Sequence, residues 1–285
     1  MKPAYITEEF LSQFIKSALE EDIGDGDHST LASIPTETVS RARLIVKEDG
    51  VLAGVELAWK IFHYVDPGMK VEVKLTDGSE IKKGDIAFTV TGSARSILST
   101  ERLVLNCMQR MSGIATKTRR LATRISGTKA KLLDTRKTTP NFRLLEKWAV
   151  AIGGGKNHRI GLYDMVMLKD NHIDFAGGIE QAINRTKDYL RAGNRKLKIE
   201  IETRNLNEVK EVLRVGGVDI IMLDNMTPAE MTEAVKLING QYEVEASGGI
   251  TEETIGEIAK CGVDFISVGA LTHTISSLDL SLKAF

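Results

Sequence analysis

The sequence LKIEIETRNLNEVKEVLRVGGVDIIMLD, residues 197–224, contains two mostly apolar strand candidates separated by an amphipathic stretch. This pattern predicts strands at 197–201 and 218–223 with a helix at 205–215 between them. Two parallel strands need a helical crossover of about this length, whereas an antiparallel pair can be joined by a short turn. The segment therefore predicts a βα unit of an α/β fold.

The same alternation continues on both sides of this segment. Further strands are predicted at 131–133, 165–168, 242–246 and 263–268. Further helices are predicted at 141–152, 178–191, 227–238 and 251–261. Mostly apolar strands in repeated βα units indicate a parallel sheet that is buried on both faces. Right-handed crossovers then favour a barrel or a doubly wound sheet.

Polar or small residues stand where the predicted strands end. These residues are Asp134, Lys169, Glu202, Asp224, Ser247 and Gly269. In a parallel barrel the carboxyl ends of all strands open on one face, and that face carries the chemistry. Charged residues also begin ordinary loops, but six strand ends of this kind in register favour an active site at one mouth.

The first part of the chain has a different pattern. A helical stripe is predicted at 8–19, and a long helical stretch from Ser96 to about Ile125 is predicted to be interrupted near Ser112-Gly113. Short strands are predicted at 43–46, 71–75 and 86–90. We expect a small sheet with a helix against it. The alternating residues 278–282 could return to this sheet as a strand.

The composition is that of a soluble globular chain. Of the 285 residues, 42% are hydrophobic and 27% are charged, which excludes a disordered chain. No apolar run reaches the ~18 residues of a membrane-spanning helix, and the first nine residues contain no apolar signal region. Cys107 and Cys261 are too few for a disulfide scaffold or a cysteine-rich zinc site. We therefore expect a cytoplasmic protein with no membrane partner.

The charge is unevenly distributed along the chain. Residues 101–143 contain eleven basic and two acidic side chains, although the formal net charge of the whole chain is −1. A stretch of this kind is either a solvated helix face or an anion site. Because only 5% of all residues are aromatic, stacking on single-stranded nucleic acid is disfavoured.

One loop near the predicted mouth reads DTRKTTPNFR over residues 134–143. Arg136 and Lys137 can present a planar fork and a point charge to an anion. The hydroxyl groups of Thr135 and Thr138 add donors. The alternative is a solvated basic loop.

A second loop, GGGKNHRIGLYD, spans residues 153–164. It does not match a Walker phosphate loop, because Val150 stands where the first glycine is needed. We expect its glycines to let His158 and Arg159 approach a ligand. A metal pair formed by His158 and His172 is disfavoured, because no third soft ligand is evident.

Ionisable residues end three further strands. Lys169 could form a Schiff base if it is desolvated, or it could stay protonated and bind anions. Glu202 and Asp224 can ligate Mg²⁺, accept sugar hydroxyls or act as bases. Glu200 lies on the same side of its strand as Glu202, and a structural ion pair and a functional role are equally open for it.

The last two predicted strands end in small residues. Ser247-Gly248-Gly249 follows one strand and Val268-Gly269-Ala270 follows the other. Loops of this kind after the late strands of a barrel form the usual phosphate cradle of such folds. Their occurrence together, in this order, predicts a phosphate site.

With these motifs, the sequence resembles the quinolinate phosphoribosyltransferase family, also called carboxylating nicotinate-nucleotide pyrophosphorylases, over nearly its whole length. The resemblance rests on residues 100–102, 134–138, 153–164, 168–172, 202, 223–225, 247–249 and 268–272. The sequence departs from the family at Asn141, where glycine is usual, and at the doubled Gly216-Gly217. Asparagine tolerates a left-handed backbone better than most residues, so we expect the turn at Asn141 to be kept.

The resemblance implies an N-terminal α/β sandwich domain plus a partial (open) TIM-like α/β barrel. We place the sandwich domain at residues 1–110 and the catalytic barrel at 111–274, with 275–285 returning to the first domain. The resemblance also implies at least a homodimer, in which the sandwich of one subunit covers the barrel of the other and Arg102 completes the neighbour's site. No nucleic acid is implied.

The implied reaction converts quinolinate and 5-phosphoribosyl 1-pyrophosphate into nicotinate mononucleotide, pyrophosphate and CO₂ in de novo NAD biosynthesis. The implied catalytic residues are Lys137, Lys169, Glu202 and Asp224. The implied quinolinate ligands are Arg102, Arg136, His158, Arg159 and Lys169, with Thr135 as an additional substrate-binding residue. Glu202 and Asp224 would hold ribose hydroxyls or Mg²⁺, and Lys137 would bind the diphosphate. The 5′-phosphate would lie on the loops at 247–249 and 268–270.

Two other functions remain open from the sequence. A Schiff-base aldolase centred on Lys169 is a different class of enzyme on the same barrel. A molybdenum-associated paralogue, or a non-catalytic nucleotide-binding relative, would keep the fold and lose this substrate. The complete set of cations disfavours a non-catalytic relative.

Overall fold

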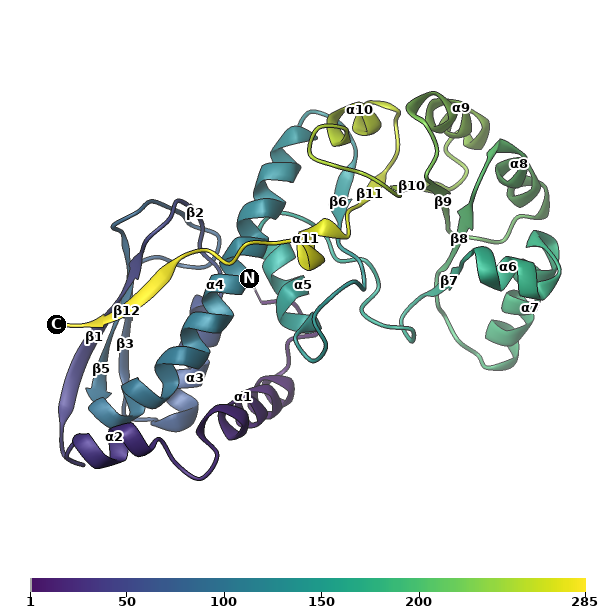
Figure 1. The fold of residues 1–285 in the computed structure, drawn as a ribbon. Coiled ribbons are helices and arrows are strands. Elements are labelled where there is room, and N and C mark those ends of the chain that lie inside the picture. Colours follow the sequence, from purple (N-terminus) through teal and green to yellow (C-terminus); the bar gives the residue numbers. More distant parts are fainter. Residues whose placement is uncertain (1) are drawn as a thin grey trace. The chain divides into compact units, whose positions relative to one another are not determined.

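A computed structural model describes residues 2–285 of the chain (Figure 1). The chain divides into two compact units. The first contains the residues up to Arg119 together with Thr138–Gly154 and Leu271–Phe285, and the second contains Arg120–Lys137 and Gly155–Ala270. Over residues 2–285, none of the helices combines the length and the hydropathy needed to cross a membrane.

The first unit is built on an antiparallel sheet of four strands in the order β12-β1-β5-β3. Its strands are β1 (Val39–Val46), β3 (Lys70–Val73), β5 (Ile86–Ser93) and β12 (Leu280–Ala284), and β2 (Gly50–Val51) pairs separately with β4 (Glu80–Ile81). The helices are α1 (Glu8–Ile23), α2 (His28–Ser33), α3 (Val55–Val65), most of α4 (Ala94–Arg124) and α5 (Arg143–Ile152). Phe62 of α3 meets Phe88 of β5 edge-on, with 5.9 Å between the ring centroids. This packing confirms the predicted sheet with a helix against it.

The carboxyl-terminal residues return to the first sheet, as the alternation at 278–282 predicted. Strand β12 pairs antiparallel with β1, and Leu282 lies opposite Leu44. Both leucines are buried, as is Leu280 two residues earlier. The return follows from the period of two, which turns alternate leucines toward one face.

Helix α4 is continuous from Ala94 to Arg124, so the predicted interruption at Ser112-Gly113 is wrong. Gly113 lets another segment approach, because a Cβ atom there would collide with the carbonyl oxygen of Ser276. The Ser112 hydroxyl accepts the N–H of Ala53 at 2.9 Å and lies 3.2 Å from the carbonyl oxygen of the same residue. These two residues therefore serve packing rather than helix termination.

Residues 138–154 group with the first unit, whereas the sequence-based division placed them in the barrel domain at 111–274. The physical reason is the packing of α5 on α4. Arg110 Nε donates to the fully buried Glu146 carboxylate at 2.7 Å. A Cβ atom on Gly153 would lie 2.5 Å from the carbonyl oxygen of Ala115. These contacts hold the segment against α4.

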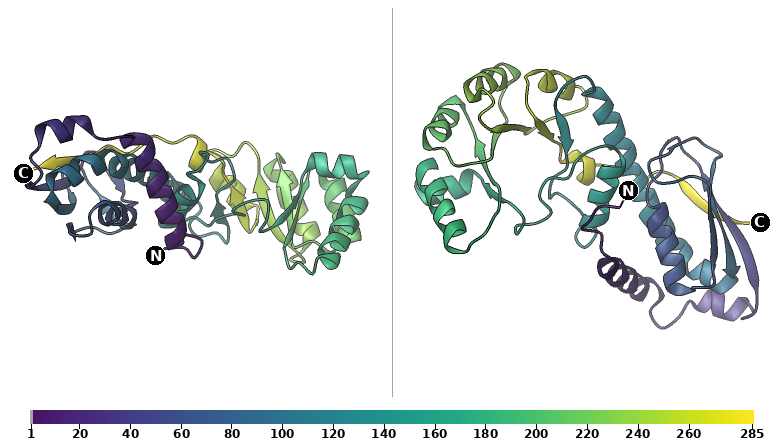
Figure 2. Two further views of the ribbon diagram at one scale, coloured as in Figure 1. Left: turned by 90° about the horizontal axis from the view of Figure 1, so that it is seen from below. Right: turned by 180° about the vertical axis from the view of Figure 1, so that it is seen from behind.

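The second unit is an open sheet of six parallel strands in the order β6-β11-β10-β9-β8-β7. The strands are β6 (Lys131–Leu133), β7 (Val166–Leu168), β8 (Ile199–Thr203), β9 (Ile220–Asp224), β10 (Glu243–Ser247) and β11 (Phe265–Ser267). The helices are α6 (Asp170–Ala176), α7 (Ile179–Ala192), α8 (Leu206–Val215), α9 (Pro228–Ile238), α10 (Ile255–Lys260) and the short α11 (Ala270–His273), which passes into the first unit. Helices α7 to α10 lie on the outer side of the curved sheet (Figures 1 and 2). Within the described residues, β6 and β7 each pair on one side only, which confirms the partial barrel.

Candidate functional site

The carboxyl ends of the six parallel strands bring the predicted residues to one edge of the second unit. Asp134 and Lys169 directly follow β6 and β7, Glu202 lies near the end of β8, and Asp224 and Ser247 are the last residues of β9 and β10. Strands β8 and β10 extend beyond their predicted ends at Ile201 and Ala246. Helix α6, which was not predicted, begins directly after Lys169, whose N–H donates to His172 Nδ1 at 3.0 Å.

Lys169, Glu202 and Asp224 form one group at this edge. Lys169 Nζ lies 3.4 Å from Glu202 Oε2, and the lysine side chain is 48% exposed. Burial and the charge of Asp224 raise the pKa of Glu202, although Lys169 opposes this shift. The Asn225 side-chain amide donates to Asp224 Oδ2 at 2.6 Å. Two carboxylates at neighbouring strand ends are therefore available to hydroxyl groups or to a hard cation.

Arg136 and Arg159 place two guanidinium groups near each other. Burial lowers the pKa of Arg159, and the positive charge of Arg136 lowers it further. Both side chains are half-buried, whereas Lys137 is exposed. The Lys137 N–H donates to Thr135 Oγ1 at 3.1 Å, which shapes the loop after β6. Two guanidinium groups that repel each other are suited to an anion with more than one carboxylate.

The loop at 247–249 has a backbone that requires glycine. Gly248 and Gly249 have φ values of +94° and +61°. A Cβ atom on Gly248 would also collide with the Asn225 side chain, which follows Asp224 on the neighbouring strand β9. The second loop, Val268-Gly269-Ala270, follows β11, which pairs with β10. The structure thus brings both predicted loops to adjacent strands.

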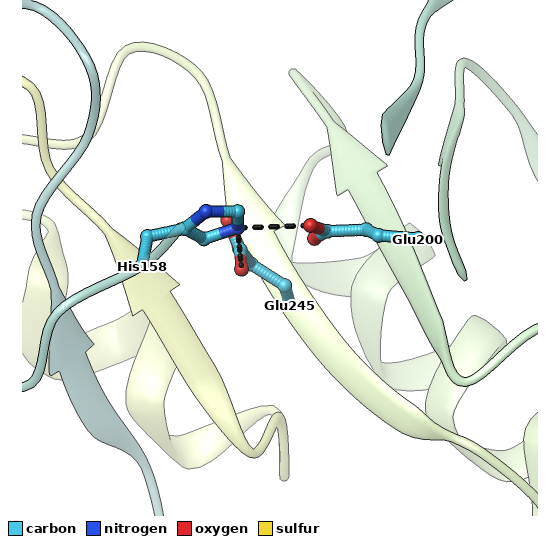
Figure 3. Close-up of side chains that lie close together, drawn as sticks. All are labelled: His158, Glu200 and Glu245. Carbon is cyan, nitrogen blue, oxygen red and sulfur yellow. Dashed lines mark hydrogen bonds and ion pairs between the residues drawn. The ribbon is translucent and has the colours of Figure 1, made fainter. Parts of the chain in front are cut away.

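His158 forms a buried cluster with Glu200 and Glu245 (Figure 3). His158 Nε2 lies 2.8 Å from Glu200 Oε2 and 3.3 Å from Glu245 Oε2. The His158 side chain is 7% exposed and both glutamates are fully buried. Figure 3 shows the histidine reaching from its loop to carboxylates on two strands, β8 and β10, which are separated by β9.

The cluster holds more protons than its members would hold in water. Burial lowers the pKa of His158, but the hydrogen bond to Glu200 and the contact with the charge of Glu245 outweigh this effect and raise it to about 10. Burial and the charge of Glu245 raise the pKa of Glu200 to about 7, against the opposing effect of His158. The Arg159 N–H donates to His158 Nδ1 at 2.7 Å, so Nε2 carries the ring hydrogen in this geometry. The raised pKa values of His158 and Glu200 belong to the cluster as a whole, in which the carboxyl groups share the further proton.

One histidine and two carboxylates are also a donor set for a divalent metal, and one ligand atom from each lies within 4.8 Å of the others. The 2.8 Å separation of His158 Nε2 and Glu200 Oε2 is a hydrogen-bond distance. Two tetrahedral ligands at the usual metal distances would lie roughly 3.3–3.5 Å apart. The geometry therefore favours a hydrogen-bonded cluster.

Sequence reasoning identified most of this edge but missed Glu245. The sequence contains a pattern that could have identified it, because Glu243 and Glu245 alternate along β10 as Glu200 and Glu202 do along β8. The remaining predicted residue, Arg102, is exposed on α4 in the first unit.

Comparison with known proteins identifies relatives over the whole length of the chain. Residues 27–112 match the quinolinate phosphoribosyl transferase N-terminal domain and residues 114–283 match its C-terminal domain. The chain is 50% identical to the nicotinate-nucleotide pyrophosphorylase [carboxylating], chloroplastic, of Arabidopsis thaliana, over 96% of this chain and 82% of that one. It is 42% identical to a probable nicotinate-nucleotide pyrophosphorylase [carboxylating] of Synechocystis, over 99% of this chain and 94% of the other. The crystal structure of NadC from Streptococcus pyogenes has 38% identity, a TM-score of 0.92, and coverage of 98% and 97%.

Proposed function

The chain belongs to the quinolinate phosphoribosyltransferase family, and we propose that its barrel edge converts quinolinate and 5-phosphoribosyl 1-pyrophosphate into nicotinate mononucleotide, pyrophosphate and CO₂. This is a pentosyl transfer of de novo NAD biosynthesis. The observation that carries the proposal is the placement of adjacent guanidinium groups and adjacent carboxylates at one edge of an open parallel barrel. The two sets suit the two substrates, a dicarboxylate and a charged sugar.

The cations bind quinolinate in this proposal. Arg136 and Arg159 receive its carboxylates, and a dianion relieves the repulsion between the two guanidinium groups. Lys169 adds a third positive charge and Thr135 a hydroxyl group. The ring nitrogen attacks C1 of the phosphoribosyl donor as the C1–oxygen bond to the diphosphate breaks. Loss of the adjacent carboxylate as CO₂ then becomes easier, because the positively charged ring stabilises the carbanion, which takes up a proton from solvent.

The carboxylates and the small loops bind the phosphoribosyl donor. Glu202 and Asp224 hold ribose hydroxyl groups and stabilise the positive charge that develops at C1. Lys137 neutralises the departing diphosphate. The 5′-phosphate lies on the loops at 247–249 and 268–270, where the glycine backbone offers N–H groups at close approach.

Glu202 and Asp224 also fit Mg²⁺, which prefers carboxylate oxygens and substrate phosphates as ligands. When bound, the ion lowers the charge of the diphosphate leaving group. The residues of the chain would then position C1 between the carboxylates and the quinolinate nitrogen.

Lys169 favours this function over an aldolase. Its side chain is half-exposed, and its amino group is paired with Glu202 at 3.4 Å. A Schiff-base lysine is instead activated by desolvation or by a neighbouring cation. The pairing with a carboxylate retains its proton, which suits anion binding.

We also propose that the site is shared in a homodimer, with Arg102 of the partner subunit binding one carboxylate of quinolinate. The support is the resemblance of residues 100–102 to the family and the exposure of Arg102 on α4. Mixing Arg102→Ala and Lys137→Ala subunits should restore activity toward half of wild type per mixed dimer. Subunit exchange without any return of activity would exclude this arrangement.

We propose a cytoplasmic compartment from the cysteines of the chain. Both cysteines are buried and unpaired in the described structure, which suits the reducing cytoplasm. The Arabidopsis relative is named as chloroplastic, so fractionation of the source cells is the direct test.

The test of the proposed function is turnover with quinolinate and phosphoribosyl pyrophosphate, with nicotinate as the control substrate. We expect nicotinate mononucleotide and CO₂ from quinolinate and no product from nicotinate, because the missing carboxylate leaves a half-buried guanidinium group unpaired. Equal turnover of nicotinate, or no turnover of quinolinate, would reject the proposal. A molybdenum-associated paralogue would give the second result.

A further inference from the structure

The ring of His158 is held on both nitrogen atoms by groups of the protein itself, and Figure 3 shows the contacts of Nε2. Nε2 donates to Glu200 Oε2 at 2.8 Å and lies 3.3 Å from Glu245 Oε2. Nδ1 accepts the backbone N–H of Arg159 at 2.7 Å. Neither nitrogen is turned toward a ligand in this arrangement. The ring links the carboxylates in the interior of the barrel to the loop at 153–164.

The main chain beside the ring is fixed as well. The His158 N–H donates to Asp134 Oδ1 at 2.8 Å, and the Asn157 side-chain amide donates to Asp134 Oδ2 at 2.7 Å. Asp134 directly follows β6 and is fully buried. The loop is therefore tied at one point to three strands, β6, β8 and β10.

Arg159 is the residue that this anchoring places. Its own guanidinium contacts are long, at 3.3 Å to the Met165 carbonyl oxygen and 3.6 Å to Met167 Sδ. The positive charge of Arg136 repels it, whereas the negative charges of Glu200 and Asp164 attract it. Because these contacts are weak, the position of the guanidinium group depends on the position of the Arg159 backbone. The bond from the Arg159 N–H to His158 Nδ1 holds this part of the backbone.

The chemistry of the cluster points to orientation rather than to stability. Burying ionisable groups carries a large desolvation penalty. Three apolar side chains of similar volume would fill the same space with a smaller penalty to the free energy of folding. Apolar side chains cannot supply the directional N–H···O bond of Glu200 or the negative charge of Glu245 beside Nε2. The cluster thus gives the ring a defined orientation at some expense of folding stability.

We propose that Glu200 and Glu245 are positioning residues that act through His158 to aim the Arg159 guanidinium group at a carboxylate of quinolinate. His158 is then a positioning residue too, and not the substrate-binding cation that the sequence predicted. This inference rests on the proposed function. It adds a support behind the quinolinate subsite and leaves the phosphoribosyl subsite unaffected.

The first test uses Glu245→Ala with Glu245→Gln as the matched variant. Glu245→Ala should raise the KM for quinolinate on the order of 10- to 100-fold, the effect of a small misplacement of a binding group. The KM for phosphoribosyl pyrophosphate should stay within about twofold of wild type. Glu245→Gln keeps the volume and a carbonyl acceptor, so it should recover most of the loss. An unchanged KM for quinolinate in Glu245→Ala, or an equal rise in both KM values, would overturn the proposal.

The second test is a double-mutant cycle with Arg159. If the cluster acts through Arg159, then Glu245→Ala should add less than about twofold to the KM for quinolinate in an Arg159→Ala background. It should keep its full effect in a Lys137→Ala background, where the missing cation belongs to the diphosphate subsite. Full additivity with Arg159→Ala would mean that the cluster acts on quinolinate by another route, and the inference would be wrong.

Two controls separate the possible failures. If Glu245→Ala does not fold, as judged by circular dichroism, the same cycle is run with His158→Gln, which keeps a side-chain N–H near the Nε2 position. Wild-type turnover is measured first. No turnover of quinolinate would reject the proposed function and this inference with it, whereas turnover with an additive cycle would reject this inference alone.

Discussion

The two ends of the six-stranded sheet both carry carboxylates, but the protein binds them differently. At the amino ends, Asp219 precedes β9 and accepts the Ile199 N–H of β8 at 2.7 Å. Asp264 precedes β11, accepts the Val244 N–H of β10 at 2.9 Å and pairs with Lys129 at 2.7 Å. Each aspartate therefore joins its own strand to the neighbouring strand.

At the carboxyl end of β8 a buried carboxylate forms only a long contact, whereas at the amino end of β9 an exposed carboxylate forms a short bond. Glu202 is almost buried, yet its contact with Lys169 is 3.4 Å long. Asp219 is exposed, yet it has a short bond to a backbone N–H group. A carboxylate that the protein satisfies with its own backbone is a structural element, whereas a buried one with unused bonding capacity is a candidate for substrate. The same sheet thus separates stability from chemistry by its two ends, except at Asp134 after β6, whose buried carboxylate holds the loop at 153–164.

The largest effect should come from removing divalent cations. Chelation with EDTA should abolish turnover, because Glu202 and Asp224 are the proposed Mg²⁺ ligands at the carboxyl ends. The melting temperature should not change, because the carboxylates at the amino ends bind backbone and lysine. Activity assays before and after adding back Mg²⁺, beside thermal unfolding, measure both. Undiminished turnover in excess chelator would contradict the magnesium proposal.

Neutralising the carboxylates at the carboxyl ends should affect activity and spare stability. Glu202→Gln and Asp224→Asn should each lower kcat on the order of 10²- to 10³-fold, as expected for groups that stabilise developing charge. Because burial raises the pKa of Glu202, its ionised form costs stability, and Glu202→Gln should unfold at the same or a higher temperature. Steady-state kinetics and calorimetry on the same samples test this. A clear fall in melting temperature would assign Glu202 to the structure instead.

The opposite result is expected at the amino ends. Asp264→Ala should lower the free energy of unfolding by about 1–3 kcal/mol, because the Val244 N–H loses its acceptor. Its kcat should stay near wild type. Asp264→Asn keeps an acceptor and should restore much of the stability, and Asp188→Asn, in an exposed pair on α7, should have almost no effect. Denaturant unfolding measures these differences. If Asp264→Ala lost turnover while remaining stable, the separation of the two ends would fail.

The smallest effect is a change in the pKa of Glu202 when its charged neighbours are replaced. The pKa of Glu202 is raised above its ordinary value of 4.5 by burial and by Asp224, against the effect of Lys169. Raising an acid's pKa favours the protonated folded state, so this stabilisation is present at low pH and is lost as pH rises through the raised pKa. Carboxyl-carbon NMR should show Asp224→Asn lowering the midpoint and Lys169→Met raising it. Shifts of the opposite sign would show that the three groups are not coupled as described.

Local sequence patterns predicted most of the second unit. The βα alternation placed all six parallel strands, although β8 to β10 end later than predicted, because polar residues such as Glu202 and Ser247 are typical of loop starts. These residues stay in strand conformation because the neighbouring strand pairs with them, as Asp224 does with Ser247. The return of β12 was also readable, since its alternating leucines need a sheet to cover them.

The sequence by itself determined which residue types stand at the strand ends, and therefore the class of chemistry at the mouth of the barrel. Only the tertiary structure decided the pairing of His158 with Glu200 and Glu245, because the three residues come from segments up to 87 positions apart that are joined only when β8, β9 and β10 assemble. It likewise decided that α4 continues through Gly113, because the close approach of Ser276 makes glycine a packing residue there. Periodicity is a local property of the chain, whereas burial and partners are set by segments distant in sequence.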